Sequence, residues 1–351
     1  MSKKLRICID LPGNINHGIF SPERGESRWA QNLAWGLAER GHQVTAYSYM
    51  YGGPAWGICP QIPNLTLTGY QLAQIQGPYD VFVDNCYWEG KPLVVEAKLN
   101  VIGKYGAEEW TKNLGDNFLV ATPYNAGWLK EHPKAKWLPA PYWKKLGEPK
   151  WSNPGLLLPS RDVCAKGDSV AQNAANVLDV LQSICPSFNI SECHFLVSHT
   201  KGHAFITNPN KQQEEKDTRE RFDLFNRAKK IPSPKFWDLQ PWNLILDLLE
   251  RRIRLNFPLL NPSNLIDSAM KGVPTILWEN GGFEWVREIA DVSDWKLNYG
   301  DPPERIAEVL EMILRYRDIY ERLLFMQQDA IRCLEWDPAL NIWEREIYAR
   351  I

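Results

Sequence analysis

Three consecutive segments near the N-terminus decide the fold: Leu5–Leu11 (LRICIDL), 26–40 (ESRWAQNLAWGLAER) and His42–Tyr47 (HQVTAY). The first and third are short apolar runs, which are typical of buried strands. In the middle segment apolar residues recur at helical spacing, and Gly41 follows as a typical helix terminator. A strand, a helix and a second strand in this order predict a βαβ unit and therefore a parallel sheet.

Similar alternation continues along the chain and favours doubly wound α/β domains. Residues 141–155 contain three prolines and two glycines, which favour a linker. Before this linker we expect strands at 81–84, 99–103 and 118–122 and a short helix at 125–131. After it we expect strands at 156–158, 193–198, 254–260, 275–278 and 294–297, helices at 168–185, 208–230 and 241–250, a loop at 232–241, and mostly helix over 302–351.

Composition narrows the class of protein. A chain of 351 residues exceeds the usual single-domain size, so two domains are expected. With 44% apolar residues, 23% charged residues and a net charge of -2, the chain is neither disordered nor strongly cationic. Seven scattered cysteines without a CxxC pair argue against a disulfide framework or a structural zinc site. No apolar run reaches the length of a membrane span, so we expect a cytoplasmic protein.

Two cations five residues apart are the first candidate site. Arg161 and Lys166 lie in the segment 160–167, between an expected strand and an expected helix. Open α/β sheets bind ligands at the carboxyl ends of their strands, and Arg with Lys suits a diphosphate. Two solvated loop cations would produce the same pattern. From the spacing alone, this second interpretation is the favoured one.

A second group of candidates follows near residue 267. Asp267 is close to the start of a short helix that Gly272 ends, and its carboxylate suits either two ribose hydroxyls or the helix N-terminus. The N–H groups of Gly281 and Gly282 are available for phosphate or sugar oxygens, although a tight turn needs the same glycines. Glu284 is a candidate hydroxyl ligand, or an ordinary exposed carboxylate.

The loop between Gly13 and Gly18 offers one titratable group. Its His17 suits proton transfer from an acceptor hydroxyl or a hydrogen bond to a sugar, although a solvated loop histidine is the ordinary case. His199 and His203 have no acid in the HExxH register, and we assign them no metal. The sequence contains no GxxxxGK[ST] loop, no GxSxG elbow and no GxGxxG fingerprint.

At these residues the sequence resembles the retaining, GT-B-fold glycosyltransferases that use nucleotide sugars, the family related to glycogen and sucrose synthases. Gly25-Glu26 and 32–44 are similar to the opening pattern GGxE...LaxxLxxrGHxV of that family. The segment 160–167 is similar to GRxxxxKG, 267–274 to EAMAxGxPV, and 280–284 to GGxxE. The order and the separations of these pieces agree with the family pattern.

The resemblance implies two Rossmann-like α/β domains that face a cleft, with a C-terminal helix crossing back. Residues 1–150 would form the acceptor-side domain, 151–333 the nucleotide-sugar domain, and 334–351 the helix that returns to the first domain. Arg161 and Lys166 would hold the donor diphosphate and stabilise its departure without a metal or another cofactor. The resemblance also implies donor contacts from Ser263, Asn264, Leu265, Asp267, Gly281, Gly282 and Glu284. From the loop itself we expect acceptor-side contacts by Gly13, Asn14 and Gly18 and a catalytic role for His17.

The sequence departs from the family pattern at the E-x7-E pair. Asp267 takes the place of the second acid, whereas the first falls at Leu259, which cannot bond a sugar hydroxyl. An alternative function is therefore a nucleotide-sugar-binding protein without transfer. The acceptor is open: a glycan, a small molecule or a hydroxymethylated base in phage-type DNA. The last would use the basic, aromatic stretch Lys130–Lys150. Lysines at a domain edge explain this stretch more simply, and the net charge of -2 favours that explanation.

Overall fold

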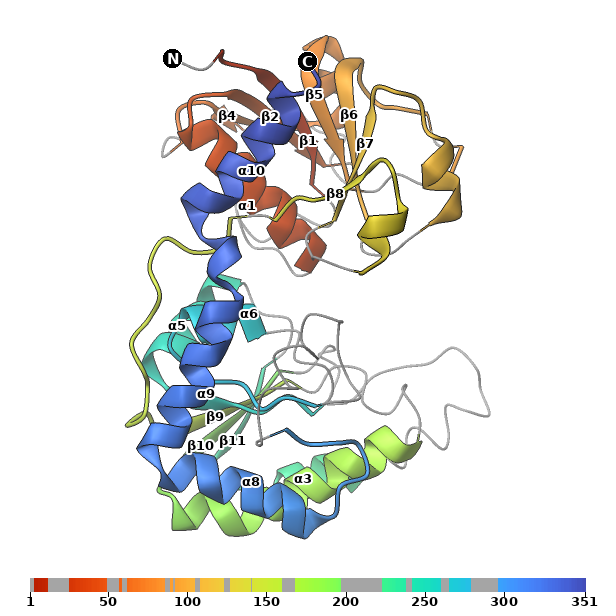
Figure 1. Cartoon of the computed structure of the whole chain (residues 1–351). Coiled ribbons are helices and arrows are strands. Elements are labelled where there is room, and N and C mark those ends of the chain that lie inside the picture. The colour runs from red at the N-terminus through yellow and green to blue at the C-terminus, as the bar shows by residue number, and fades with distance from the viewer. Residues whose placement is uncertain are drawn as a thin grey trace. The chain divides into compact units, whose positions relative to one another are not determined.

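The computed structural model divides the chain into two compact units (Figure 1). The first unit contains residues 1–144 and 333–351, and the second contains residues 145–332. The first unit is therefore built from both ends of the chain. The described residues are 3–11, 25–48, 57–58, 62–85, 89–90, 92–104, 108–122, 127–139, 141–159, 168–196, 223–237, 242–259, 265–278 and 296–351.

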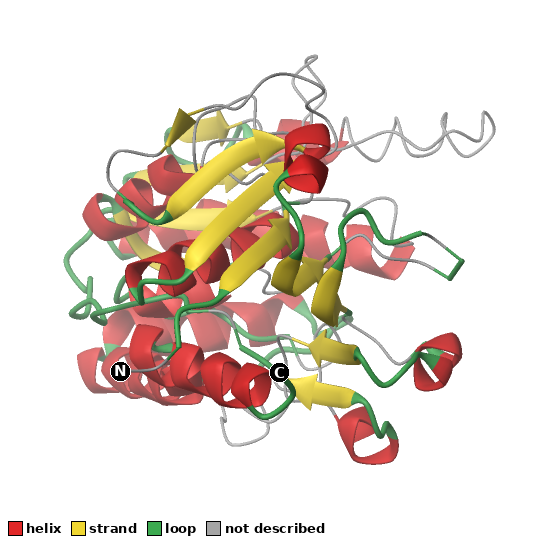
Figure 2. Ribbon diagram, turned by 90° about the horizontal axis from the view of Figure 1, so that it is seen from above, coloured by secondary structure: helices red, strands yellow, loops and turns green. Residues whose placement is uncertain are grey.

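A mostly parallel sheet forms the centre of the first unit (Figure 2). Its order is β3-β4-β2-β1-β5-β6-β7-β8, which reverses between β1 and β5 as in a doubly wound sheet. The predicted βαβ unit is confirmed, since β1 pairs in parallel with β2. The strands are β1 (Arg6–Asp10), β2 (Gln43–Ser48), β3 (Gly57–Ile58, antiparallel to β4), β4 (Leu65–Gly69), β5 (Tyr79–Asp84), β6 (Ala97–Gly103), β7 (Phe118–Thr122) and β8 (Ala135–Trp137). The helices are α1 (Gly25–Glu39), α2 (Tyr70–Ile75) and α10 (Trp336–Tyr348), with 3-10 helices η2 (Glu109–Asn113) and η3 (Gly127–Glu131).

The last helix of the chain, α10, packs beside α1 (Figure 1). Trp29 and Leu33 of α1 are buried in the same apolar core as Leu340 and Trp343 of α10. Gly36 allows this close approach, because a Cβ atom there would lie 2.7 Å from Cδ2 of Leu340. The chain thus completes the core of its N-terminal sheet with residues from its C-terminus.

The two stretches of chain that connect the units pair with each other within the first unit. The N–H of Tyr142 donates to the carbonyl oxygen of Leu334 at 2.9 Å, and the N–H of Trp336 donates to that of Trp143 at 2.9 Å. A parallel bridge between Trp143 and Glu335 completes the contact. Leaving and returning segments therefore form a short two-stranded ladder.

Glu39, the last residue of α1, holds both of these stretches. Its carboxylate accepts hydrogen bonds from the indole N–H groups of Trp35 at 2.8 Å and Trp336 at 3.0 Å. It also forms an ion pair with Lys144 at 2.9 Å. The Nζ atom of Lys144 lies 4.8 Å from the centroid of the Trp336 ring, a cation–π distance. One carboxylate thus joins the outgoing and the returning chain to α1.

A parallel sheet with the order β11-β10-β9-β12 forms the centre of the second unit. Single parallel bridges from Asn256 to Thr275 and from Trp278 to Leu297 continue it beyond β12. This second parallel sheet confirms the predicted α/β fold class. The strands are β9 (Gly155–Pro159), β10 (Glu192–Leu196), β11 (Pro234–Trp237) and β12 (Ile253–Asn256). The helices with described bounds are α3 (Asp168–Ser187), α5 (Trp242–Arg251), α6 (Leu265–Met270), α8 (Pro303–Arg315) and α9 (Arg317–Ala330), with the 3-10 helix η5 (Arg332–Leu334) at the boundary between the units. Residues 223–228, the described part of the helix expected at 208–230, are also helical.

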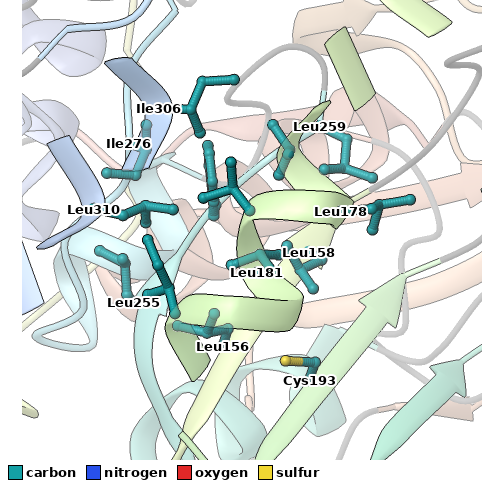
Figure 3. Packing of buried hydrophobic residues seen from close by; sticks show 14 of the residues in the cluster. Leu156, Leu158, Leu178, Leu181, Cys193, Leu255, Leu259, Ile276, Ile306 and Leu310 are labelled. Carbon is teal, nitrogen blue, oxygen red and sulfur yellow. The ribbon is translucent and has the colours of Figure 1, made fainter. Parts of the chain in front are cut away.

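Helices α3 and α8 lie side by side and cover one face of the second sheet (Figures 1 and 3). Alternate residues of β9 and the apolar stripes of both helices meet in one core, because period 2 in the strand and period 3.6 in the helices aim these side chains together. Figure 3 shows part of this core, with Leu156, Leu158, Leu178, Leu181, Leu255, Leu259, Ile276, Ile306 and Leu310.

Among the described residues, no helix is long and apolar enough to cross a membrane.

A buried arginine ties the end of α8 to the sheet. Arg254 of β12 is 8% exposed, and its Nη2 donates to the carbonyl oxygen of Leu314 at 2.6 Å. The guanidinium lies 3.9 Å from the centroid of the Trp151 ring. A cation at the C-terminus of α8 complements the partial negative charge of the last carbonyl groups.

Three predicted elements need correction. The expected loop 232–241 contains strand β11, because Pro234 lies at the start of an edge strand, where its missing N–H is tolerated. The expected strand 254–260 ends at Asn256, and within 275–278 the structure has isolated bridges at Thr275 and Trp278 instead of a full strand. The apolar residues there are buried by packing and not by a regular ladder.

A buried histidine joins strands β10 and β11. Nδ1 of His194 accepts a hydrogen bond from the indole N–H of Trp237 at 3.0 Å, and its Nε2 lies 3.3 Å from a carboxylate oxygen of Glu192. Burial raises the pKa of Glu192, but its contacts with Lys235, His194 and Arg252 outweigh burial and leave that pKa below its ordinary value. Burial has the largest effect on His194 and lowers its pKa below the ordinary 6.5. Glu192 raises this pKa and the positive charges of Lys235 and Arg252 lower it, and the net result stays below the ordinary value.

We expect the free energy of unfolding to fall as the pH drops below about 6.5. With a lowered folded-state pKa, folded His194 binds fewer protons than unfolded His194, so its stabilisation is present above the unfolded pKa and is lost at lower pH. Protonation would also place two donors, on Nδ1 and on Trp237, against each other. Urea unfolding at pH 7.5 and 5.5 measures the effect, and His194→Gln should reduce the difference. Identical pH dependence in both proteins would contradict the role of His194.

Candidate functional site

Asp267, predicted from the sequence to bind the donor, lies on the short helix α6. All six residues of α6 are buried, and Asp267 is 2% exposed. Gly272 ends this segment with φ +81°, and a Cβ atom there would collide with the carbonyl oxygen of Glu148. Only glycine combines this backbone conformation with such a close approach. Leu265, another predicted donor residue, begins α6 and has no exposed surface.

Asn256 fixes α6 to the sheet and was missed by the sequence analysis. It is fully buried at the end of β12, and its Nδ2 donates to Oγ of Ser268 at 2.9 Å and to Oγ1 of Thr275 at 3.0 Å. A buried amide that bridges a helix and the next chain segment determines where the helix lies. The polar residue inside an apolar strand was the one available signal.

The position expected for the first acid of the family pair is a core position. Leu259 has no exposed surface and belongs to the apolar core of the second unit. Its backbone N–H donates to the carbonyl oxygen of Pro159 at 2.9 Å, which extends the contact between the chain beyond β12 and the end of β9. An acid at this place would be buried among leucines, so the departure from the family pattern matches its surroundings.

The topology of the second sheet places two predicted donor segments after neighbouring strands. The segment with Arg161 and Lys166 connects the carboxyl end of β9 to α3, and the chain after β12 leads to α6 and Asp267. Strands β9 and β12 pair in parallel, so their carboxyl ends lie at the same edge of the sheet. This edge is where open α/β sheets bind ligands.

The side chains of most predicted site residues fall outside the described part of the chain. The structure therefore tests the strands and helices that flank them and not their own positions. In the first unit, the predicted acceptor loop connects β1 to α1. The residues concerned are Gly13, Asn14, His17, Gly18, Arg161, Lys166, Ser263, Asn264, Gly281, Gly282 and Glu284.

Two lysines of the basic stretch 130–150 have structural partners. Lys134 donates to the carbonyl oxygens of Leu114 and Gly115 after η2, and Lys144 forms the ion pair with Glu39 described above. These contacts give both lysines a role at the surface of the first unit.

Among the described residues, no three His, Cys, Asp or Glu side chains lie close enough to hold a metal ion together.

Comparison with known proteins gives similarity in structure but not in sequence. No protein-family model and no curated protein matches the sequence. Sucrose-phosphate synthase from Thermosynechococcus elongatus has a TM-score of 0.63 at 11% identity, over 99% of this chain and 100% of that chain. WaaG, a glycosyltransferase involved in lipopolysaccharide biosynthesis, has a TM-score of 0.55 at 14% identity, over 92% and 94% of the two chains. A trehalose-6-phosphate structure from E. coli bound with UDP-2-fluoro glucose has a TM-score of 0.58 at 8% identity, over 97% and 98%.

These similarities show the fold. They extend over nearly the whole of this chain, and therefore over both units. The GT-B fold that the sequence resemblance implied is thus confirmed.

Proposed function

We propose that the protein transfers a sugar from a nucleotide-diphosphate sugar to an acceptor hydroxyl. The observation that carries the proposal is the placement of two donor segments after β9 and β12, whose carboxyl ends share one edge of the second sheet. The order of the family motifs along the sequence and the similarity in fold to glycosyltransferases support it.

In this reaction the bond between the anomeric carbon and the diphosphate oxygen breaks, and the diphosphate leaves with negative charge. Arg161 and Lys166 would stabilise that charge, the arginine through two parallel N–H donors and the lysine as a point charge. Asp267 would hold the ribose hydroxyls. With two cations on the leaving group, the proposed transfer needs no metal ion. From the resemblance to the retaining family we propose that the anomeric configuration is retained.

We assign the acceptor side to the loop between β1 and α1. His17 in this loop would accept the proton of the acceptor hydroxyl as that oxygen attacks the sugar. Gly13, Asn14 and Gly18 would contribute backbone and amide hydrogen bonds. A glycan or a small molecule is the favoured acceptor class. Modified DNA is disfavoured because Lys134 and Lys144 are engaged within the protein.

Thermal stabilisation by a panel of nucleoside diphosphates and nucleotide sugars tests the proposal. A ligand present at 100 times its Kd should contribute about 2.7 kcal/mol to the free energy of unfolding. We expect one base to stand out, and the corresponding nucleotide sugars to identify the donor. If no nucleotide changes the melting temperature, the proposed donor site does not exist and the fold similarity reflects ancestry alone.

A second candidate is a protein that binds nucleotide sugars without transferring the sugar. The buried Leu259 at the place of the first family acid favours it, because that acid would contact the donor sugar. Release of nucleoside diphosphate from the nucleotide sugar, with or without an acceptor, separates the two functions. Binding combined with no release, even with a broad set of acceptors, would establish the second one.

A further inference from the structure

The end of α6 is fastened to the segment through which the chain enters the second unit. The N–H of Gly147 donates to the carbonyl oxygen of Met270 at 2.8 Å, and the N–H of Lys150 donates to that of Gly272 at 3.0 Å. A Cβ atom at Gly147 would lie 2.6 Å from the carbonyl carbon of Lys271, so the two backbones are in direct contact. We call residues 147–150 the entry segment.

One buried side chain joins the entry segment, α6 and α9. Gln328 of α9 is 7% exposed, and its Nε2 donates to the carbonyl oxygens of Gly147 and Ala269, both at 3.0 Å. The neighbouring Gln327 is fully buried and pairs with both backbone groups of Thr275, at 2.9 and 2.7 Å. Helix α9 thus holds the chain on both sides of the turn that follows α6.

Helix α6 depends on these contacts because it is short. It contains six residues, which is little more than one helical turn and a half. Isolated helices of this length are unstable in water, so tertiary contacts must determine its position. Gln328 donates from its one amide group to the buried carbonyl oxygen of Ala269 and to the half-buried one of Gly147. Removing the partner of a buried polar group costs free energy.

We propose that Gln328 is a positioning residue for the nucleotide donor, acting through α6 and the entry segment. This inference rests on the proposed function, in which Asp267 on α6 binds the donor ribose. Hydrogen bonds to hydroxyl groups weaken steeply with distance and angle, so a shift of α6 would weaken nucleotide binding even though Gln328 does not touch the ligand. The entry segment begins two residues after Lys145, the first residue of the second unit. Because Gly147 and Lys150 donate to carbonyl oxygens at the end of α6, nucleotide binding at α6 would also reduce the backbone mobility of the entry segment.

Gln328→Leu tests the inference, because leucine has a similar volume and no amide donor. Asn153→Leu is the matched control, since Nδ2 of Asn153 donates to the carbonyl oxygen of Ile253 at 3.1 Å, at the opposite end of β12 from α6. UDP, ADP and GDP are titrated separately by calorimetry into each folded protein. We expect Gln328→Leu to weaken the affinity for the bound nucleotide about tenfold, whereas Asn153→Leu lowers the melting temperature and leaves the affinity within about twofold.

Hydrogen exchange of the wild-type protein provides a second measurement that needs no variant. The backbone N–H groups of Gly147 and Lys150 should exchange more slowly when the nucleotide is bound, as measured by mass spectrometry on the peptide 145–152. This measurement stands in for the titration if Gln328→Leu does not fold.

The outcomes separate this inference from the proposed function. Wild-type binding that both variants retain, or lose equally, would show that Gln328 is only a structural residue. Unchanged exchange in 145–152 on nucleotide binding would overturn the inference in the same way. If the wild-type protein binds none of the three nucleotides, the proposed function itself is wrong, and the positioning role is overturned with it.

Discussion

Replacing Arg161 by alanine is expected to lower the rate of sugar transfer about 100- to 1,000-fold, the usual effect of removing one preorganised donor to a developing negative charge. Arg161 is the bidentate partner proposed for the diphosphate, which becomes most negative in the transition state. The binding of substrate should change less than the rate, because only interactions that strengthen in the transition state accelerate the reaction. Initial rates at saturating and limiting nucleotide sugar separate kcat from KM.

Arg251→Ala is a suitable control for Arg161→Ala. Arg251 ends α5, is largely exposed and forms an ion pair with Asp247 at 2.7 Å, one turn earlier on the same helix. Its replacement removes the same charge from the same unit and should leave the transfer rate within about twofold, as exposed ion pairs contribute little. Equal rates for Arg161→Ala and the control would exclude Arg161 from the reaction.

Replacing Trp343 by alanine is expected to lower the free energy of unfolding of the first unit by about 3 to 5 kcal/mol. Trp343 of α10 has no exposed surface, and its ring centroid lies 5.5 Å from that of Trp29 on α1. Its indole N–H donates to the carbonyl oxygen of Pro139 at 2.8 Å. The substitution therefore creates a cavity and leaves that buried carbonyl without its donor.

Calorimetry on the whole protein measures this effect, with two variants for comparison. Trp343→Phe retains most of the packing and should cost less than alanine. Arg345→Ala changes an exposed residue of the same helix, whose side chain is 71% exposed, and should alter the free energy of unfolding by at most about 0.5 kcal/mol. A Trp343→Ala protein as stable as the Arg345→Ala protein would show that α10 does not hold the first unit together.

The sequence predicted those elements whose signal is local. Residues 5–47 combine period-2 and period-3.6 patterns with a glycine terminator, and the structure contains the strand, helix and strand expected there. Strand β11 was missed because Pro232 and Pro234 are typical of a loop, and proline is tolerated only at the edge or the start of a strand. Its pairing with β10 depends on a strand some forty residues earlier, which no local pattern shows.

The candidate site was predictable only in part, for a related reason. Arg161, Lys166 and Asp267 belong to motifs with fixed spacing. Asn256 and Gln328 act through partners 12 to 181 residues away in sequence, and a single glutamine on a helix gives no sign of the carbonyl groups it will meet. The residues that hold α6 in place are therefore visible only in the structure, whereas the residues proposed to carry the chemistry stay predictions from motifs.

The division of the first unit between the two ends of the chain affects the order in which the two units can complete their folding during synthesis. The second unit is one continuous stretch, so its residues are all available before Leu340, Trp343 and Ile347 of α10 are translated. Until then the apolar residues of α1, including Trp29 and Leu33, lack their contacts with α10. We therefore expect the first unit, although its synthesis begins earlier, to complete its core only after the whole second unit has been made.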